Sequence, residues 1–431
     1  MKRSPSLALF GGKPVRSRPF ASHPVLGAEE RREVLSVLET GLLSGFIAHA
    51  GPSFLGGPKV RAFEALARRH FKMPYAVAVN SATAGLHAAL AALGIGPGDE
   101  VIVTPYTMSA SAAAILMQNA VPVFADVDPG TFCLDPRDVA RKITRRTRAI
   151  LVVHLFGQSA PMNEILALAR RHKLAVVEDC AQSPDAAYRG RKVGTLGDIG
   201  VFSLNQHKTI TTGEGGWALT RDPKLALRMQ LVRNHGEVVV DHVKAAFDPG
   251  PVLGWNYRMT ELEGAVAVAQ FRRLKALNAH RIRLAGYLKK KLSGLHGLKV
   301  AETRKGSSHV YFLLAFHYDA AGTGIPRDVF VRALAAEGVA FGAGYVRPIY
   351  LDRAYRQRRI YANSPEPFTN APRYRRGDCP VAERLHFKEL VTTNLCRYPL
   401  TPRDMDDVAR AVRKVLSAAA ELRARGSGGK A

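Results

Sequence analysis

The stretch Phe202-Ser203-Leu204-Asn205-Gln206-His207-Lys208, followed by Thr211-Thr212-Gly213-Glu214-Gly215-Gly216, carries the strongest signal in this 431-residue chain. An apolar run, 199–202, leads to a serine, then to a lysine, then to a glycine-rich turn. A lysine held beside the end of a buried strand loses its proton more easily, and a neutral amine can form a Schiff base. Because most lysines are solvated surface charges, Lys208 needs a second matching element before it can be taken as catalytic.

That second element lies upstream, where Val176-Val177-Glu178-Asp179 forms an apolar strand that ends in acids. An acid at this place can pair with a pyridine nitrogen, as the partner of a lysine-bound pyridoxal phosphate does. The alternative is an acid that caps a helix or forms an ion pair. Gln182 follows three residues later and could contact the same group. The two elements together predict a pyridoxal phosphate site in which Lys208 forms the Schiff base and then moves the proton.

A candidate phosphate site lies in Asn80-Ser81-Ala82-Thr83-Ala84-Gly85, which follows a predicted strand and opens a predicted helix. Small hydroxyl residues and free helix N–H groups suit a phosphate. An ordinary helix N-cap would use the same residues. The place after a strand of a parallel sheet favours the phosphate, since ligands gather at the carboxyl ends of strands. Ser203, five residues before Lys208, could bind the same phosphate.

The order of the predicted elements favours an α/β fold. Apolar strands alternate with amphipathic helices between residues 76 and 177, which is typical of a buried, mainly parallel sheet. A composition shift near residue 275 predicts an N-terminal arm and large cofactor-binding domain over 1–275, and a smaller C-terminal α+β domain over 276–431. The predicted strands are 76–79, 100–104, 121–124, 149–153, 174–177, 199–202 and 311–316, and the predicted helices are 29–39, 58–71, 83–93, 109–118, 136–143, 163–172, 281–292, 328–337 and 404–422.

Residues 346–395 are rich in Tyr, Pro and Arg and have no clear periodicity. We expect a long irregular segment there. Such segments often carry specificity, so this one is predicted to help select the substrate.

The net charge of +26 raises the question of nucleic-acid binding. The basic residues are spread along the chain, with small clusters at 68–72, 137–148 and 373–376. We therefore expect no nucleic-acid partner. The charge is explained either by an arginine-rich surface that keeps the protein in solution or by attraction of an anionic substrate.

No apolar run approaches the roughly 20 residues that span a bilayer, and the apolar stretch at 7–10 is short for a secretion signal. We expect no membrane partner, and we expect a cytoplasmic location. The cysteines form no CxxC pair and no zinc-like cluster, so we expect reduced thiols and no metal site.

Two further motifs allow alternatives. Thr260 and Glu263 match a capping box at the start of a helix, while Asn256 and Arg258 could instead bind an anion. His154 follows a strand and either lines the site or packs in the core.

Taken in order, these motifs resemble those of the DegT/DnrJ/StrS aminotransferases, pyridoxal-phosphate enzymes that aminate keto-sugars and ketocyclitols. The resemblance covers roughly residues 8 to 415. It is carried by Asn80-Ser81-Ala82-Thr83-Ala84-Gly85-Leu86, Gly96-Pro97-Gly98-Asp99-Glu100-Val101-Ile102, Val177-Glu178-Asp179-Cys180-Ala181-Gln182, Gly197-Asp198-Ile199-Gly200, Gly213-Glu214-Gly215-Gly216 and Asn256-Tyr257-Arg258-Met259-Thr260.

The resemblance implies a type I aminotransferase fold and a homodimer whose active sites lie at the subunit interface. It implies the Schiff-base role for Lys208, the pyridinium contact for Asp179 and a ring or hydroxyl contact for Gln182. It also implies that the phosphate is bound by Ala82, Thr83 and Ser203, and by Asn256 from the neighbouring subunit.

Two positions depart from the family pattern. Met108 stands where the family has an aromatic residue on the cofactor ring, and a methionine can pack there through its sulfur. Asn205 stands where many sugar-nucleotide members have histidine, which resembles the branch that aminates scyllo-inosose-type cyclitols or makes aminohydroxybenzoate.

The expected function is transfer of the amino group of L-glutamine or L-glutamate to a cyclic ketone, either a ketocyclitol or a keto-sugar nucleotide, by a ping-pong mechanism. One alternative is a sugar dehydratase, although such relatives replace the lysine with histidine. The other is a non-catalytic regulatory or nucleic-acid-binding relative.

Overall fold

A seven-stranded sheet forms the centre of the larger part of the molecule. The computed structural model describes residues 6–242 and 245–426; residues 1–5, 243–244 and 427–431 lie outside it. The strand order is β1-β9-β8-β5-β4-β2-β3. The pairs β8-β5-β4-β2-β3 are parallel, whereas β9 is antiparallel to β8 and to β1. The predicted mainly parallel sheet is therefore confirmed.

The strands are β1 (Tyr75–Val79), β2 (Glu100–Val103), β3 (Val121–Phe124), β4 (Thr147–Val153), β5 (Ala175–Asp179), β6 (Ala187–Tyr188), β7 (Arg191–Lys192), β8 (Ile199–Ser203), β9 (Gly216–Thr220), β10 (Leu298–Val300), β11 (Leu314–Tyr318), β12 (Gly342–Ala343) and β13 (Leu390–Thr393). The helices are α1 (Ala28–Thr40), α2 (Pro58–Phe71), α3 (Ala82–Ala92), α4 (Ala110–Met117), α5 (Pro136–Lys142), α6 (Met162–His172), α7 (Pro223–Arg233), α8 (Glu261–Leu292), α9 (Ala320–Thr323), α10 (Arg327–Ala336), α11 (Arg353–Gln357), α12 (Pro380–Arg384), α13 (Pro402–Ser417) and α14 (Ala419–Gly426).

Helices α2 and α8 cover one face of strands β1, β8 and β9 through an aromatic core. The rings of Phe202 and Trp217 stack with centroids 4.6 Å apart, and Phe63 and Phe271 meet Trp217 edge-on. These rings are buried. Burial of large aromatic side chains holds the carboxyl ends of β8 and β9 in fixed positions.

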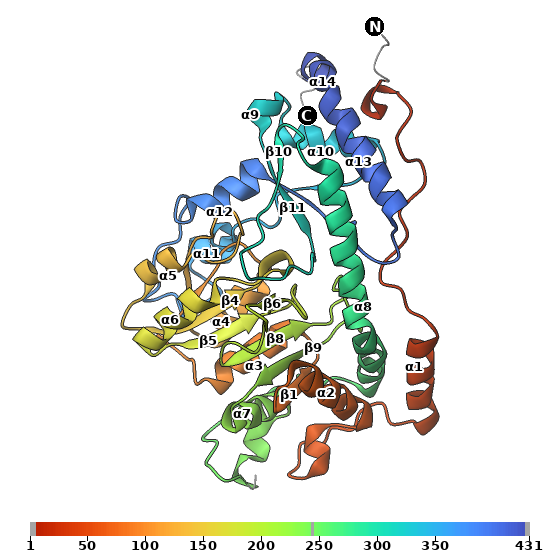
Figure 1. The fold of residues 1–431 in the computed structure, drawn as a ribbon. Helices are drawn as coiled ribbons and strands as arrows, with labels where there is room; N and C mark the ends of the chain where they lie inside the picture. The colour runs from red at the N-terminus through yellow and green to blue at the C-terminus, as the bar shows by residue number, and fades with distance from the viewer. Residues whose placement is uncertain (1–5, 243–244, 427–431) are drawn as a thin grey trace.

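Helix α8 connects the two parts of the molecule (Figure 1). It begins at the capping box predicted for Thr260 and Glu263, which is confirmed, and it continues through residue 275. At its far end it packs on a four-stranded sheet of order β10-β11-β13-β12, whose core includes Leu7 from the N-terminal arm. The division at residue 275 thus falls inside one helix, and it stays a prediction.

Several elements differ from the sequence prediction. Strand β9 and helix α7 were not predicted from the sequence. Strand β9 follows two glycines and is stabilised by antiparallel pairing with β1 and β8. The strand predicted at 311–316 begins later, at Leu314, because Tyr311 has a φ of 50°. The predicted terminal helix is two helices, α13 and α14, with a break at Ala418.

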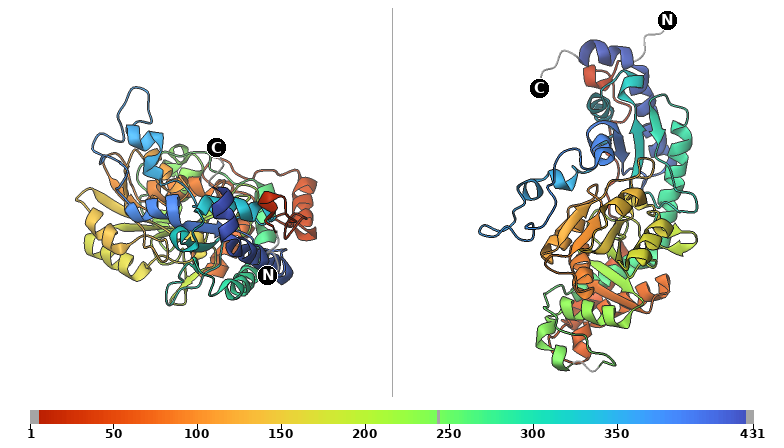
Figure 2. Two further views of the ribbon diagram at one scale, coloured as in Figure 1. Left: turned by 90° about the horizontal axis from the view of Figure 1, so that it is seen from above. Right: turned by 90° about the vertical axis from the view of Figure 1, so that its left-hand side faces the viewer.

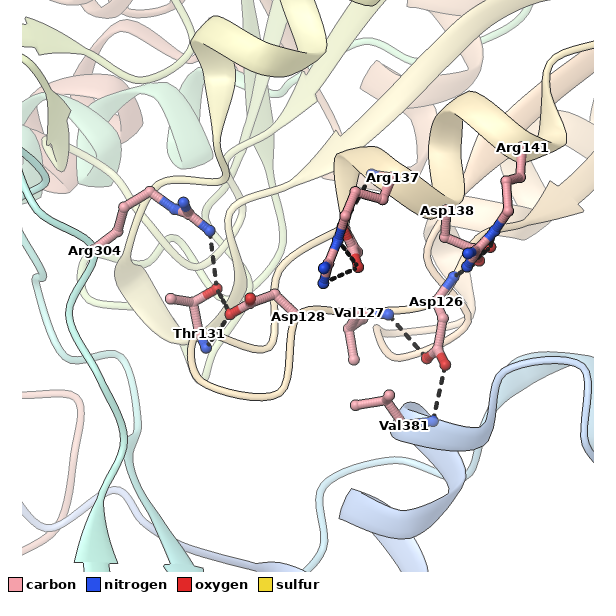
Figure 3. A network of polar contacts seen from close by, with 10 residues as sticks. Asp126, Val127, Asp128, Thr131, Arg137, Asp138, Arg141, Arg304 and Val381 are labelled. Carbon is pink, nitrogen blue, oxygen red and sulfur yellow. Dashed lines mark hydrogen bonds and ion pairs between the residues drawn. The ribbon is translucent and has the colours of Figure 1, made fainter.

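The segment 346–395 is less irregular than predicted. It contains α11, α12 and β13, and β13 pairs with β11 and β12 inside the small sheet. Figure 2 shows much of the segment extending from the body of the molecule. The Asp126 carboxylate accepts the Val381 and Ala382 amides at 2.8 and 2.9 Å, so it caps α12 from the large domain (Figure 3).

Within the described ranges, no helix has the length and apolar character needed to cross a membrane.

Candidate active site

Lys208 lies in the loop between β8 and β9, at the carboxyl edge of the large sheet. Its side chain is half-buried, and its Nζ lies 4.9 Å from the centre of the Phe312 ring. Burial lowers the pKa of Lys208 below its ordinary value, while the Asp179 carboxylate acts in the opposite direction. On the other side, His23 Nε2 donates to the Lys208 carbonyl oxygen at 3.1 Å. The backbone of Lys208 is thus held in place, and its amine loses its proton more readily than that of an exposed lysine.

Asp179 ends β5 and is 5 % exposed. One carboxylate oxygen accepts the Ser111 hydroxyl at 2.8 Å, and the other accepts the Ala181 amide at 3.0 Å. Two donors orient the carboxylate but leave acceptor capacity, since a carboxylate offers about four lone-pair sites. Asp179 therefore suits a cationic partner such as a pyridinium N–H.

The neighbouring Glu178 points to the opposite face of the strand and has a different role. It accepts His154 Nε2 at 2.9 Å and the amides of Gly194, Leu196 and Gly197 at 2.7–2.8 Å. Burial alone would raise the pKa of Glu178, but these donors hold it below its ordinary value. His154 Nδ1 accepts the Ala160 amide at 3.0 Å.

This arrangement decides the open question on His154 in favour of a packed residue. Glu178, His154 and Cys180 lie close enough to hold a metal ion. Both ring nitrogens of His154 and both oxygens of Glu178 are used within the protein, however, and burial raises the pKa of the Cys180 thiol. The cluster holds the 194–197 turn and does not offer ready ligands.

The proposed phosphate-binding residues meet around Gly216. Gly216 pairs with Ser203 across β8 and β9, and a Cβ added to it would lie 2.8 Å from the Ala82 nitrogen. Ser81 caps α3 by accepting the Ala84 amide, so the N-cap reading is correct for Ser81 itself. The N–H groups of Ala82 and Thr83 have no acceptor in the part of the chain that the structure describes. Ala82, Thr83 and Ser203 thus surround a positively polarised helix end.

Gln182 lies close to this site but is engaged within the protein. Its Oε1 accepts the Phe156 amide at 2.9 Å, and its Nε2 donates to the Tyr345 hydroxyl at 3.0 Å. Burial raises the pKa of Tyr345 to about 12. Gln182 therefore links the large domain to the approach to the 346–395 segment, and its contact with a cofactor stays a prediction.

Met108 and Asn256 are exposed in the single chain. Met108 is 58 % exposed and stands one turn before Ser111, the partner of Asp179. The backbone oxygen of Asn256 accepts the Asn80 side chain at 3.3 Å, which places its segment beside the start of α3. The Arg258 side chain donates to Asn234, so Arg258 is not a free anion ligand.

These residues fit pyridoxal phosphate. A lysine of lowered pKa faces a buried carboxylate that has spare acceptor capacity, and a glycine cradle lies against unpaired helix N–H groups. The set offers an amine for a carbonyl, an acid for a ring nitrogen and donors for a phosphate.

Four contributing residues were not found from the sequence: Ser111, Tyr345, Phe312 and His23. Ser111 stands in a run of Ser and Ala with no distinguishing pattern. Tyr345 lies one residue before the predicted specificity segment. Phe312 and His23 reach Lys208 from distant parts of the chain, and no local spacing signals such contacts.

Comparison with known proteins supports the same assignment. The chain is 37% identical to the L-glutamine:2-deoxy-scyllo-inosose aminotransferase of Streptoalloteichus tenebrarius, over 97% of this chain and 99% of that one. It is 38% identical to the GDP-perosamine synthase of Caulobacter vibrioides, over 73% and 81% of the two chains.

Among solved structures, the aminotransferase from Psychrobacter cryohalolentis is 30% identical, covers 93% of this chain and 100% of its own, and superposes with a TM-score of 0.81. This likeness confirms the predicted aminotransferase fold. The model of the DegT/DnrJ/EryC1/StrS aminotransferase family matches residues 46–412. The chain therefore belongs to the DegT/DnrJ/EryC1/StrS aminotransferase family.

Proposed function

We propose that this protein uses pyridoxal phosphate to transfer the amino group of L-glutamine to a cyclic ketone of the scyllo-inosose class. The observation that carries the proposal is the placement of Lys208 beside Asp179, at the sheet edge where α3 begins. This placement supports a site in which Lys208 is the covalent lysine, Asp179 the partner of a ring nitrogen and the start of α3 the phosphate site.

When bound, pyridoxal phosphate supplies a carbonyl for covalent capture and an electron-withdrawing ring. Asp179 holds a proton on the ring nitrogen, because Ser111 and Ala181 keep its carboxylate oriented. The N–H groups of Ala82 and Thr83 and the Ser203 hydroxyl bind the phosphate. Lys208 Nζ would take the proton from the α-carbon of the donor.

The names of two relatives support the proposed donor and acceptor. L-glutamine and 2-deoxy-scyllo-inosose are named for a protein that matches nearly the whole chain. GDP-perosamine synthase matches a smaller share of the chain, so a keto-sugar nucleotide is the second candidate acceptor. Incubation with glutamine and each ketone separates them, since only the true acceptor gives an aminated product in repeated turnovers.

The first test is the visible absorption of the purified protein with pyridoxal phosphate, before and after L-glutamine. We expect an absorption band of the bound cofactor that disappears with glutamine. A band that forms but does not change when glutamine or glutamate is added would contradict the donor assignment. No band at all would contradict the cofactor site.

We also propose a homodimer with shared active sites, because Met108 and Asn256 are exposed in the single chain. The test mixes two inactive variants, Lys208→Ala and Asn256→Ala, after unfolding and refolding them together. If Asn256 acts on the neighbouring subunit, mixed dimers contain one intact site and activity returns. If it acts on its own subunit, or if the protein is a monomer, no activity returns.

A further inference from the structure

A second concave site lies at the edge of the large sheet formed by β3. Its volume is about 610 Å³, within the range of small-molecule sites. We call it the β3 groove, and it is formed by residues of β3 and α5, the turn before β4, and 370–378. Strands β5, β4 and β2 lie between β8 and β3, so at about 4.8 Å per strand the groove is roughly 19 Å from the strand that precedes Lys208.

The groove brings together two basic clusters that are more than 200 residues apart in the sequence. Its basic side chains are Arg141, Lys142, Arg146, Arg373 and Arg375, and its acidic side chains are Glu100 and Asp378. Part of the charge that the sequence spreads over the chain is thus concentrated around one cavity.

Two of these arginines, Arg141 and Arg146, pair with carboxylates that are buried beneath them. Arg146 contacts Glu100 at 2.5 Å, and Arg141 contacts Asp138 at 2.9 Å, as Figure 3 shows for the latter pair. The arginine side chains are 51 % and 71 % exposed, whereas the acids are 2 % and 8 % exposed. A ligand in the groove therefore meets these two guanidinium groups before their carboxylates. Asp378, which lies 3.7 Å from Arg375 and is 26 % exposed, is the one partly exposed carboxylate of the lining that the structure describes.

Two further cations add to this surface. Lys142 is half-buried and Arg373 is exposed, and neither has a carboxylate partner among residues 6–242 and 245–426. A half-buried ammonium group without a counterion favours binding of an anion, because the anion reduces the cost of the partial desolvation.

The floor of the groove is apolar and firmly held. Tyr374 donates its hydroxyl to the Pro122 carbonyl at 2.7 Å, and its ring lies 5.5 Å from Phe124, edge to face. Ala371 and Pro372 extend the floor. These contacts hold the 370–378 backbone against β3, so that Arg373 and Arg375 are attached to a rigid base.

We propose that the β3 groove binds an organic polyphosphate, a molecule with an apolar ring and two or more phosphate groups. The cationic rim matches the phosphates, since guanidinium groups pair with phosphate oxygens through two parallel hydrogen bonds. The apolar floor matches the ring. The groove shares no residue with the cofactor-binding part of the candidate active site, although 370–378 belongs to the 346–395 segment.

The test is calorimetric titration of the cofactor-loaded protein with ADP, pyrophosphate and adenosine. We expect ADP to bind most tightly, pyrophosphate less tightly and adenosine least. Arg373→Gln/Arg375→Gln and, separately, Arg141→Gln should weaken ADP binding by at least about tenfold. The matched control is Arg170→Gln/Arg171→Gln, which removes the same charge from the exposed last turn of α6 and should change the affinity less than about twofold.

The absorption change with L-glutamine should be the same in the groove variants as in the wild type, which separates the groove from the active site. An absence of ADP binding would overturn the proposal. So would an equal loss of affinity in the control, because binding would then follow net charge alone. Unchanged binding in both groove variants would also overturn it.

Discussion

The carboxyl edge of the large sheet and the 346–395 segment hold their functional groups in different ways. At the sheet edge, Asp179 and Ser203 end strands whose register is fixed by the continuous ladder β5-β8-β9. The segment is attached by separate contacts, such as Asp126 at the start of α12 and Tyr374 on Pro122. The groups expected to carry out the transfer thus stand on a rigid frame. The groups expected to select the acceptor stand on the 346–395 segment, which can change without loss of the transfer reaction.

The largest expected effect is that of Lys208→Ala at the rigid edge. Loss of the covalent and proton-moving amine should lower turnover by at least roughly 10³-fold. The matched control is Lys289→Ala. Lys289 belongs to α8, and its amine also lies over an aromatic ring, that of Tyr311. Steady-state amination of the ketone measures both. Full turnover in Lys208→Ala would disprove the mechanism.

Asp179→Asn should have the next largest effect. The side chain keeps its shape but loses the charge that holds a proton on the ring nitrogen, and we expect the donor half-reaction to slow by about 10²-fold. Ser111→Ala removes one donor to the same carboxylate. We expect it to slow the donor half-reaction by about tenfold, because hydrogen bonds to charged groups are worth about 1.5–3 kcal/mol. Stopped-flow absorption with L-glutamine measures both rates. A larger loss in Ser111→Ala than in Asp179→Asn would contradict this order.

Glu178→Gln tests the rigidity of the edge instead of its chemistry. Loss of the charged acceptor of His154 and three amides should destabilise the fold by about 3 kcal/mol. Because the folded-state pKa is lowered, the contribution is fully present above the unfolded value of about 4.3, and it is lost as the pH falls through the lowered pKa. Denaturant unfolding at several pH values measures the difference from wild type, with Glu164→Gln as a surface control. A difference that grows toward low pH would contradict the assignment.

The same contrast explains what the sequence could and could not predict. The central parallel strands could be predicted from their apolar runs, and Lys208, Asp179, Ser203 and Thr83 could be proposed as site residues because their motifs lie at or after the ends of strands. The partners of these residues could not, because Ser111 and Tyr345 reach them only through tertiary packing. Strand β13 was missed because its four residues are stabilised by pairing with β11 and β12, which no local pattern encodes.

The smallest effect, and the most selective, is expected for Asp126→Asn. Asp126 caps α12 from the large domain and accepts one amide on each carboxylate oxygen, whereas Asn has one acceptor oxygen, so one hydrogen bond worth about 1 kcal/mol is lost from the cap. The matched control is Asp135→Asn, which weakens the cap of α5 without touching the segment. Both variants should show the same absorption change with L-glutamine. Only Asp126→Asn should raise the KM for the ketone, by about fivefold if the cap energy is lost from the acceptor site alone. Equal KM values in the two variants would mean that the segment does not select the acceptor, whereas a slower donor half-reaction in Asp126→Asn would mean that the frame and the segment are not separable.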